Sequence, residues 1–592
     1  MTTTAIETVP RGGEWLLEAA PLDTVFTPER MTAEHRLIQQ TAQEFTNEVA
    51  EHTDQLETKD WDLTRELLRR AGELGLLATD VPETYGGLAL DKASAAIIAG
   101  CFGQLGSFSA TYGAHANLAI LPIRMFGTDE QKQRYLPGLV TGETVGAYCL
   151  SEAGSGSDAL GARARATRQP DGSFVLNGEK MWITNGGFAD LYIVFAKVDG
   201  EHFTAFIVER GYDGVSTGKE EHKMGLHGSS TTPVILQDVR VPADNLLGEI
   251  GKGHKVAFNV LNFGRLKLGA STAGGARGAI GEAARYAAGR RQFGQPIASF
   301  GAIRHKIGGM VARTYALESM VFRTVGLIDR TLEGADPGDG RATLRALEEY
   351  AVESSILKVA GSETLHEVLD ENVQIHGGNG FVRDYPAERH YRDSRVNRIF
   401  EGTNEINRLL IAGMLVKRAV KGELALIPAA KRLQDELLAP STAAAPGDRL
   451  AVAAAAAGMF RKVGLAVIGL AMQTYGQKLS EQQEVLSFAA DVAIDTYAAD
   501  SAVARARVSA QTNATGADLH ADAAVSYVNG AAMRIETAAR GAFAAMAEGD
   551  TLRTHLAGLR RLLKVTPVND VRIRRRLSDA AVERGAYPLA GA

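Results

Sequence analysis

The spacing of apolar residues changes twice along this chain, and this pattern constrains the fold more than any single motif. Across residues 32–125 apolar side chains recur at the spacing of a buried helix face. After Gly146 the pattern becomes that of strands, and Asn177 with Gly178 predicts a hairpin turn. Strands are predicted on either side of this turn, at residues 174–176 and 179–183, and again at residues 191–197 and 203–209. Helical spacing returns over residues 254–420, so we predict a mainly α fold with a central β domain.

The length of 592 residues is too great for one compact domain. The predicted divisions are an N-terminal segment at 1–31, a helical domain at 32–145, a β domain at 146–250, a helical bundle at 251–420, a linker at 421–447 and an additional helical domain at 448–592. The linker prediction rests on a stretch of Pro, Ser, Thr and Ala before Gly447. The last division is rich in alanine and has helical spacing.

Composition argues against several classes of function. A net charge of -6 and a pI near 6.2 give no electrostatic footprint for nucleic acid, so no nucleic-acid partner is expected. The two cysteines, Cys101 and Cys149, favour a reducing compartment over a disulfide framework. The 13 histidines show no H-E-x-x-H spacing, and no metal site is predicted. The glycines within residues 154–161 lack the spacing of a Rossmann loop, which disfavours an NAD site.

Targeting signals are also not apparent in the sequence. The first thirty residues carry more acidic than basic side chains and no sustained apolar run, unlike a secretory or transit peptide. The nearest approach to a membrane span, residues 451–475, is interrupted by Arg461 and Lys462. We therefore expect a cytoplasmic protein.

A candidate catalytic base lies at Glu401, between Phe400 and Gly402 and just before a predicted helix. Flanking by Ile399 and Phe400 can desolvate the carboxylate, which raises its pKa and lets it accept a proton from a weak acid. The alternative is a glutamate stabilised by the dipole of the following helix, which would have a lowered pKa.

The surrounding residues favour the catalytic interpretation. Gln374-Ile-His-Gly377-Gly378-Asn-Gly-Phe precedes Glu401, and residues 148–158 form Tyr-Cys-Leu-Ser-Glu-Ala-Gly-Ser-Gly-Ser-Asp, followed by Trp-Ile-Thr at 182–184. The two longer motifs resemble the two signatures of the acyl-CoA dehydrogenases, in the correct order and roughly 200 residues apart. The resemblance covers residues 26–420 and implies a helix, β-barrel, helix core with FAD as cofactor. The C-terminal helical domain is similar to that of the very-long-chain branch.

In that family the first motif meets the flavin. The resemblance assigns flavin contacts to Tyr148, Cys149, Leu150, Ser151, Ser157, Trp182, Ile183 and Thr184. Trp182 would stack on the ring, and Thr184 would place a hydroxyl near its reactive nitrogen. From the residues alone, the serine loop is equally a solvated turn, and Trp182 is equally a half-buried strand aromatic.

A second group of residues would reach the FAD of a neighbouring subunit, which implies an obligatory homodimer. The resemblance places Arg290, Phe293, Gln374, Gly377 and Gly378 in this group. A guanidinium fork suits phosphate oxygens, and glycines let a backbone approach a ligand closely. Thr403 and Glu405 begin the next helix, where free N–H groups would serve the cofactor, although Thr403 is equally an ordinary N-cap.

The acyl-CoA substrate would meet a third group of residues, namely Ser157, Asn262, Arg265, Phe400, Glu401 and Gly402. Arg265 is equally a structural ion-pair residue. The implied reaction is α,β-dehydrogenation of a long-chain fatty acyl-CoA to a trans-2-enoyl-CoA in fatty acid β-oxidation. Glu401 would take the α proton, the β hydrogen would leave as hydride to the flavin, and an electron-transferring flavoprotein would receive the electrons.

Two other functions stay open. One is a flavin oxidase of the same fold, a subgroup whose base is an aspartate. The other is an assembly factor acting through the tail. An apolar stretch at residues 458–472 and a basic cluster near the C-terminus predict weak peripheral contact with an anionic membrane. The basic residues are Arg553, Arg560, Arg561, Lys564, Arg572, Arg574, Arg575 and Arg576. The alternative is that the apolar stretch packs inside the tail while the arginines pair with acids.

Overall fold

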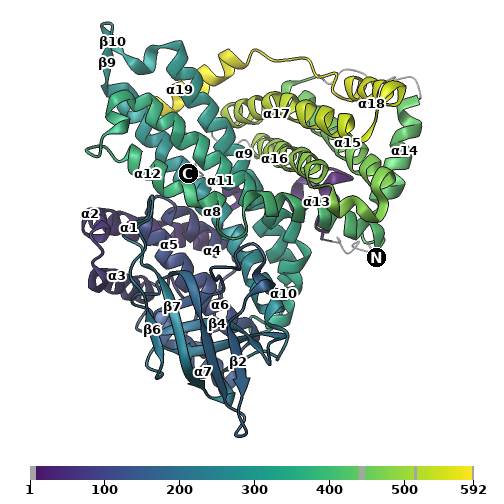
Figure 1. Ribbon diagram of the computed structural model, residues 1–592. Helices are drawn as coiled ribbons and strands as arrows, with labels where there is room; N and C mark the ends of the chain where they lie inside the picture. The colour runs from purple at the N-terminus through teal and green to yellow at the C-terminus, as the bar shows by residue number, and fades with distance from the viewer. Residues whose placement is uncertain (1–8, 439–446, 513–515, 590–592) are drawn as a thin grey trace, which may run out of the picture.

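The computed structural model describes residues 9–438, 447–512 and 516–589. A twisted sheet lies at the bottom of the view in Figure 1, with the N-terminal helices α1 to α5 beside it. Long helices α8, α9 and α11 occupy the middle of the molecule, and C-terminal helices α15 to α18 lie at the upper right. The predicted order of helices, sheet and helices is confirmed.

The N-terminal helices form because caps and apolar faces coincide. Thr32 closes a capping box at the start of α1, and Asp60 accepts the Leu63 amide at the start of α3. The elements are α1 (Ala33–Glu51), α2 (Thr53–Glu57), α3 (Trp61–Glu73), α4 (Lys92–Phe102), α5 (Ser107–Gly113), the π-helical turn η5 (Ala114–Ala119), α6 (Ile120–Phe126) and α7 (Asp129–Thr141). Helix α4 is buried along its whole length and packs on α8.

Eight strands make one sheet in the order β6-β7-β3-β2-β4-β5-β8, with β1 parallel to β4. They are β1 (Gly146–Cys149), β2 (Arg165–Arg168), β3 (Phe174–Thr184), β4 (Leu191–Val198), β5 (His202–Glu209), β6 (Val215–Thr217), β7 (Thr231–Val241) and β8 (Leu246–Leu247). Both faces of strand β4 are apolar. One face packs against α6 and α7, and the other packs against apolar side chains of the other strands. The sheet is thereby fixed to the N-terminal helices.

The predicted hairpin at Asn177 and Gly178 is wrong. Strand β3 continues through both residues, and its register with β7 shifts between Leu176 and Gly178. A Cβ on Gly178 would lie 2.7 Å from the Cβ of Ala164, so the glycine permits close backbone approach at a bulge. The Asn-Gly pair marked an irregularity in one strand and did not mark a turn.

The helical bundle of the core is built on α8 and α11, which pack along each other. Its elements are α8 (Gly253–Gly289), the short strands β9 (Arg291–Gln292) and β10 (Gln295–Pro296), α9 (Gly301–Leu332), α10 (Gly340–Glu349), α11 (Ala351–His376), η9 (Gly377–Phe381), α12 (Ala387–Ser394), η10 (Arg395–Arg398) and α13 (Asn404–Val420). Glu401 lies in the short connection between η10 and α13.

The predicted linker at 421–447 contains a helix, α14 (Leu426–Leu438), that packs on α15. Leu426, Ala429 and Leu433 recur at helical spacing and are buried, which is why this segment folds against its neighbour. The linker prediction is therefore wrong for these residues. Residues 439–446, which hold most of the Pro, Ser, Thr and Ala stretch, lie outside the described residues.

The tail consists of α15 (Arg449–Tyr475), η11 (Gly476–Glu481), α16 (Gln483–Gln511), α17 (Ala517–Met546), α18 (Gly549–Leu562) and α19 (Asp570–Arg584). Within the described residues one segment, Arg449–Glu481, is long and apolar enough to cross a membrane, and half of its most apolar window is buried in the molecule. Helix α15 packs against α14, α16 and α17, as the core helix of a bundle does. Arg461 binds Asp500 at 2.5 Å, and Lys462 pairs with Glu436.

Buried ion pairs join this tail to the core. Arg505 on α16 is fully buried and binds Glu318 on α9 at 2.7 Å and Glu29 of the N-terminal segment at 2.6 Å. Arg323 on α9 binds Asp500 on α16 at 2.9 Å. Paired buried charges hold specific geometry, and loss of one partner leaves the other charge uncompensated. The tail is therefore part of the core's own packing.

Arg505→Met should lower the free energy of unfolding by about 3–5 kcal/mol, because Glu29 and Glu318 stay buried after their shared partner is removed. Denaturant unfolding and limited proteolysis of the tail measure this loss. The matched control is Arg553→Met on α18, whose pair with Asp550 is exposed and should contribute less than about 1 kcal/mol. Equal stability of the two variants would show that the buried pairs do not hold the tail.

Candidate active site

Glu401 has an unusual backbone conformation that its neighbours hold in place. Its φ is 58°, in the left-handed region, and Gly402 follows with a φ of 81°. Arg265 Nε on α8 donates to the Glu401 carbonyl at 3.0 Å. Asn407 Nδ2 on α13 donates to the carbonyls of Gly402 at 2.8 Å and Thr403 at 3.0 Å. A strained glutamate held by two side chains is the kind of outlier found at functional sites.

One oxygen of the Glu401 carboxylate, Oε2, is buried and has no hydrogen-bond partner among the described residues, while the residue as a whole is partly exposed. Burial raises its pKa from the usual 4.5 to about 7, although the positive charges of Arg265 and Lys358 act in the opposite direction. Gly264 makes room for the carboxylate, because a Cβ there would lie 2.9 Å from both Glu401 oxygens. This direction of shift argues against the alternative in which the helix dipole dominates.

The expected cause of this burial is wrong. Ile399 is 53% exposed and Phe400 is 38% exposed, so these neighbours in sequence do not cover the carboxylate. Helix α8 covers the carboxylate instead, because Gly264 lies against it. Charged and aromatic side chains from other elements lie near it as well. Tyr148 on β1 is one of them, since its buried hydroxyl has no partner and its pKa is raised by burial and then by Glu401.

Of the predicted substrate residues Asn262 and Arg265, Arg265 binds Glu401 directly and Asn262 accepts from Arg265. Both are buried on α8, and Arg265 donates to Asn262 Oδ1 at 3.1 Å. Burial lowers the pKa of Arg265, while the Glu401 charge raises it. Arg265 thus binds the backbone of Glu401 and forms no direct ion pair with its carboxylate, which leaves that carboxylate available.

The loop after β1 is held by a buried ion pair that the sequence motifs did not single out. Lys180 on β3 is fully buried and binds Glu152 at 2.7 Å and the Leu150 carbonyl at 3.2 Å. Glu152 also accepts the Arg163 and Ala164 amides at 2.6 and 3.0 Å. These contacts bring residues 150–152 beside residues 180–182. The two predicted flavin-binding segments are therefore adjacent in the fold.

The side chains of these two segments differ in exposure. Cys149 and Ile183 are buried in the sheet, Leu150, Ser151 and Thr184 are partly buried, and Ser157 is exposed. Trp182 is 57% exposed and has a φ of 58° at a register shift of β3. A large aromatic side chain turned outward by an irregular strand forms a flat apolar surface for a ligand ring.

The second predicted group lies at the opposite end of α8. Gly264 and Arg290 are separated by 26 residues, or about 39 Å along the helix axis. Arg290 follows the last residue of α8 and is exposed, and Phe293 is 94% exposed. Gln374, Gly377 and Gly378 lie where α11 ends and are also exposed. The two predicted groups of the same chain are therefore far apart along α8.

A stacked pair of rings joins the members of this second group. Tyr286 on α8 stacks on His376 of α11 with 4.0 Å between ring centroids. Its hydroxyl donates to the His376 carbonyl at 3.1 Å and accepts from Asn379 at 3.0 Å. The ends of α8 and α11 therefore form one surface, on which Phe293 and the 87% exposed Phe381 are apolar.

Thr403 and Glu405 lie next to Glu401 at the start of α13. The Thr403 side chain accepts the Ile406 amide at 3.3 Å, so the residue is an N-cap. Glu405 is exposed, and its pKa is lowered by hydrogen bonds at the helix N-terminus.

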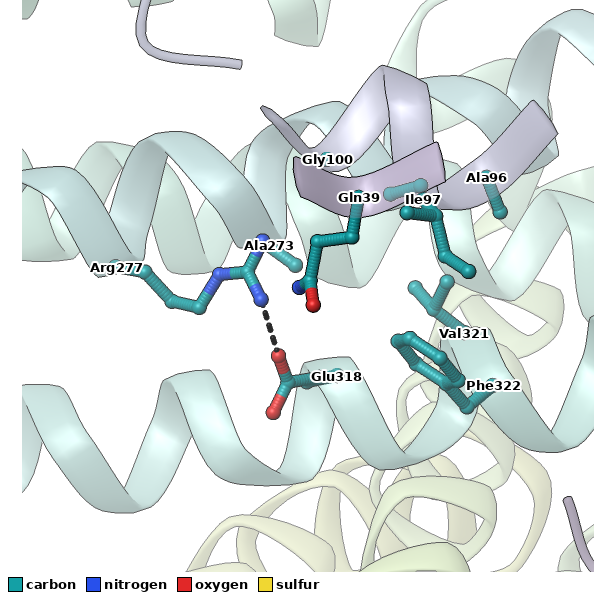
Figure 2. Close-up of a pocket in the computed structure, with 10 residues that line it drawn as sticks. Gln39, Ala96, Ile97, Gly100, Ala273, Arg277, Glu318, Val321 and Phe322 are labelled. Atoms are coloured by element: carbon teal, nitrogen blue, oxygen red, sulfur yellow. Dashed lines mark hydrogen bonds and ion pairs between the residues drawn. The ribbon is translucent and has the colours of Figure 1, made fainter. Parts of the chain in front are cut away.

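A separate small cavity lies between α1, α4, α8 and α9 (Figure 2). The Arg277 and Glu318 pair lies at one side of it, with 2.8 Å between Nη1 and Oε1, and Phe322 at the other. None of the predicted site residues lines this cavity.

The fold and the site together define a flavin-linked oxidoreductase with a buried carboxylate beside the predicted flavin loop. Comparison with known proteins gives the family. Models of the acyl-CoA dehydrogenase N-terminal, middle and C-terminal domains match residues 32–143, 147–239 and 251–416, and a further C-terminal domain model matches residues 459–561. The chain belongs to the acyl-CoA dehydrogenase family.

Individual relatives agree. The chain is 47% identical over 594 residues to a probable acyl-CoA dehydrogenase of Bacillus subtilis (strain 168), covering 98% of this chain and 99% of that one. It is 42% identical over 352 residues to the human mitochondrial very long-chain specific acyl-CoA dehydrogenase, covering 57% of this chain and 51% of that one. A crystal structure of an acyl-CoA dehydrogenase complexed with FAD from Bacillus anthracis has a TM-score of 0.96 at 47% identity, covering 98% and 99% of the two chains.

The cofactor is FAD, and the residues present fit it. Gly154, Gly156, Gly377 and Gly378 have no atom within 4 Å of a Cβ built on them, so the backbone is open there. Trp182 offers an exposed ring, and Arg290 forms no side-chain hydrogen bond or ion pair within the described ranges. These features provide a flat surface, open backbone and a guanidinium, which match a flavin ring and a pyrophosphate.

Sequence reasoning missed four residues at this site: Gly264, Lys358, Asn407 and Lys180. Gly264 immediately precedes Arg265 and Asn407 lies six residues after Glu401, and this nearness in sequence is the only signal that points to them. Lys358 lies on α11, 43 residues before Glu401, and Lys180 lies on β3 opposite Glu152. No local pattern marks these two lysines.

Gly264→Ala should displace the Glu401 carboxylate and slow flavin reduction by acyl-CoA about 100-fold, because a small misplacement of a reacting group is costly. The matched control is Gly413→Ala on α13, where a Cβ meets nothing within 4 Å and the rate should stay within about 2-fold. Anaerobic stopped-flow absorbance measures both rates. A normal rate in the Gly264 variant would mean that the carboxylate does not react from this position.

Proposed function

We propose that this protein dehydrogenates long-chain fatty acyl-CoA at the α and β carbons in fatty acid β-oxidation, with Glu401 as the base. The observation that carries the proposal is the buried, unpaired Glu401 carboxylate with a pKa of about 7. A base with a pKa near the working pH combines a deprotonated ground state with adequate proton affinity. The product is a trans-2-enoyl-CoA.

The α C–H bond of a thioester is a weak acid, so its carbonyl must be polarised as the proton leaves. The Glu401 amide N–H has no acceptor within residues 9–438, 447–512 and 516–589, which leaves it available to the thioester oxygen. Arg265 and Asn407 bind the Glu401 carbonyl in the following peptide unit and so hold the backbone of this residue in place. When bound, FAD supplies the hydride acceptor for the β hydrogen.

Chain length and electron acceptor are parts of the same proposal. A C-terminal helical domain and the similarity to a very long-chain specific enzyme support long-chain substrates. An electron-transferring flavoprotein is proposed as acceptor, in a cytoplasmic setting. The balance of 70 acidic and 64 basic residues, with two free buried cysteines, is compatible with a reducing compartment.

A homodimer is proposed because two half-sites lie about 39 Å apart on one helix. Glu401 lies beside Gly264 in the first half of α8, and Arg290 with Gln374, Gly377 and Gly378 lies at its C-terminal end. In a dimer, the second group would contact the FAD bound by the partner subunit. Exposed Phe293 and Phe381 give this surface an apolar contact.

Weak contact of the C-terminal domain with an anionic membrane also remains a proposal. Its support is the basic composition near the C-terminus. Several of these cations already have acidic partners, since Arg553 binds Asp550, Arg574 binds Asp570 and Arg576 binds Asp522. The folded tail therefore supports the intramolecular alternative at these positions.

The competing functions have less support. A flavin oxidase of this fold uses an aspartate as base, whereas this chain has Glu401. An assembly factor would not need a buried carboxylate with a pKa of about 7. Flavin reduction by acyl-CoA separates both competitors from a dehydrogenase.

Glu401→Gln should keep FAD and bind acyl-CoA but reduce the flavin at least about 1,000-fold more slowly, because an amide accepts no proton. Acyl-CoAs of graded chain length, mixed anaerobically with the wild-type protein and the variant, provide the test. The wild-type rate should be greatest with long chains. Rapid reduction in the variant would assign the base to another residue.

Arg290→Ala should weaken FAD retention and the dimer together, since the guanidinium is proposed to reach the partner's FAD. The flavin-to-protein absorbance ratio and sedimentation at low protein concentration measure the two effects. The matched control is Arg291→Ala, because Arg291 is also exposed but donates to Gly294 within its own turn. A fully flavinylated, dimeric Arg290 variant would contradict the assignment.

A further inference from the structure

A chain of ion pairs runs from the C-terminal domain to the helix that follows Glu401. Asp491 on α16 accepts from Arg408 Nε on α13 at 2.7 Å. Arg408 also binds both oxygens of Glu363 on α11, at 2.8 and 3.0 Å. Two-point binding by a guanidinium fixes the position of the carboxylate it holds. The tail, α13 and α11 are thereby joined through one arginine.

Asn404 continues the chain toward the active site. Its Nδ2 donates to Glu363 Oε1 at 3.0 Å, and its Oδ1 accepts from Lys358 Nζ at 2.7 Å. The carboxylate on one side and the ammonium on the other determine which way the amide points. Asn404 is the first residue of α13, three positions after Glu401.

Lys358 is fully buried on α11 and has no carboxylate within hydrogen-bonding distance in the described parts of the chain. The charged groups that face it are Glu401, Arg265, Glu405 and Glu363. Burial lowers its pKa to about 7, and the charge of Glu401 is the largest opposing influence. The groups that face Glu401 in turn are Arg265, Lys358 and Tyr148.

We propose that Lys358 is a positioning residue for the base: in its charged form this buried side chain favours the carboxylate form of Glu401, and the C-terminal domain fixes its position through Asp491, Arg408, Glu363 and Asn404. The inference rests on Glu401 being the base of the proposed function. It gives the tail a role in the chemistry in addition to its role in packing.

The physical reason is that the two cations near Glu401, Arg265 and Lys358, have different hydrogen-bond partners. Arg265 donates to the Glu401 carbonyl and to Asn262, so its geometry is set by the backbone. Lys358 has Asn404 as its hydrogen-bond acceptor, and a neutral amide leaves the positive charge uncompensated. An uncompensated cation favours the Glu401 carboxylate before the reaction. After Glu401 has taken the substrate's α proton, the same cation favours release of that proton.

The test is the pH dependence of flavin reduction under saturating acyl-CoA. Lys358→Met removes the cation, so the pKa of Glu401 rises and the midpoint of the pH profile should move upward by about one pH unit. The rate at high pH should stay close to that of the wild type. Lys358→Arg keeps a positive charge and should restore the midpoint toward its wild-type value.

The matched control is Lys267→Met, which removes another buried lysine of the core. Lys267 binds Asn117 at 2.7 Å and lies 3.5 Å from Asp80, and it is not among the groups that act on Glu401. Its variant should leave the midpoint unchanged. FAD content and thermal unfolding of each variant show that the folded holoenzyme is being compared.

Arg408→Met tests the connection to the tail without changing Lys358. Removing this more distant cation should raise the midpoint by less than Lys358→Met does, and the double variant should show no further shift, because Arg408 acts through Lys358. If Lys358→Met fails to retain FAD, Arg408→Met still tests the proposal.

The outcomes separate this inference from the proposed function. An unchanged midpoint in Lys358→Met, or in Arg408→Met where the first variant does not fold, would overturn the inference while Glu401→Gln still abolishes reduction. Rapid reduction in Glu401→Gln would instead remove the base assignment on which both depend. Additive shifts in the double variant would overturn the connection to the tail.

Discussion

The constraint on which the site depends is a carboxylate buried without a direct ionic partner. A charged group in this position is unfavourable unless cations lie near it, yet a tight ion pair would lower its pKa and remove its basicity. Glu401 meets both demands, because Arg265 binds its backbone and Lys358 binds Asn404. The resulting pKa of about 7 reflects burial that is partly offset by charges held at a distance.

Ion pairs also integrate the C-terminal domain with the core. Arg505 connects α16 to α9 and to the N-terminal segment, and Arg408 connects α16 to α11. The N-terminal segment is held in a similar way, since Trp15 Nε1 and the Gly13 amide both donate to the buried Glu353 at 2.8 and 2.7 Å. The helices that hold Glu401 thus pack against both the N-terminal segment and the C-terminal domain.

Helix α8 contributes to two separate parts of the predicted site. Its middle carries Gly264 and Arg265 beside Glu401, and Arg290 follows its far end. A helix of 37 residues is rigid enough to keep these two groups at a constant separation. In the proposed dimer, a second copy would bring the far end of its own α8 to the flavin site, and this separation is the physical argument for that proposal.

Much of this protein was determined by local sequence. Periodicity alone predicted the order of helices, sheet and helices, because burial of one face imposes a period on each element. The motifs around Tyr148, Trp182 and Glu401 identified the segments of the site and the family. Local patterns failed at Gly178, where β3 continues through the Asn-Gly pair with a bulge beside Ala164, and at residues 426–438, which fold against α15.

Only the tertiary structure decided what surrounds Glu401. Ile399 and Phe400 adjoin it in sequence but are exposed, whereas Gly264, Lys358 and Asn407 are brought to it by the packing of α8, α11 and α13. The pKa of a buried carboxylate depends on solvent exclusion and on charges that approach through space. A sequence states that the carboxylate exists, and the packing of distant helices sets whether it can act as a base.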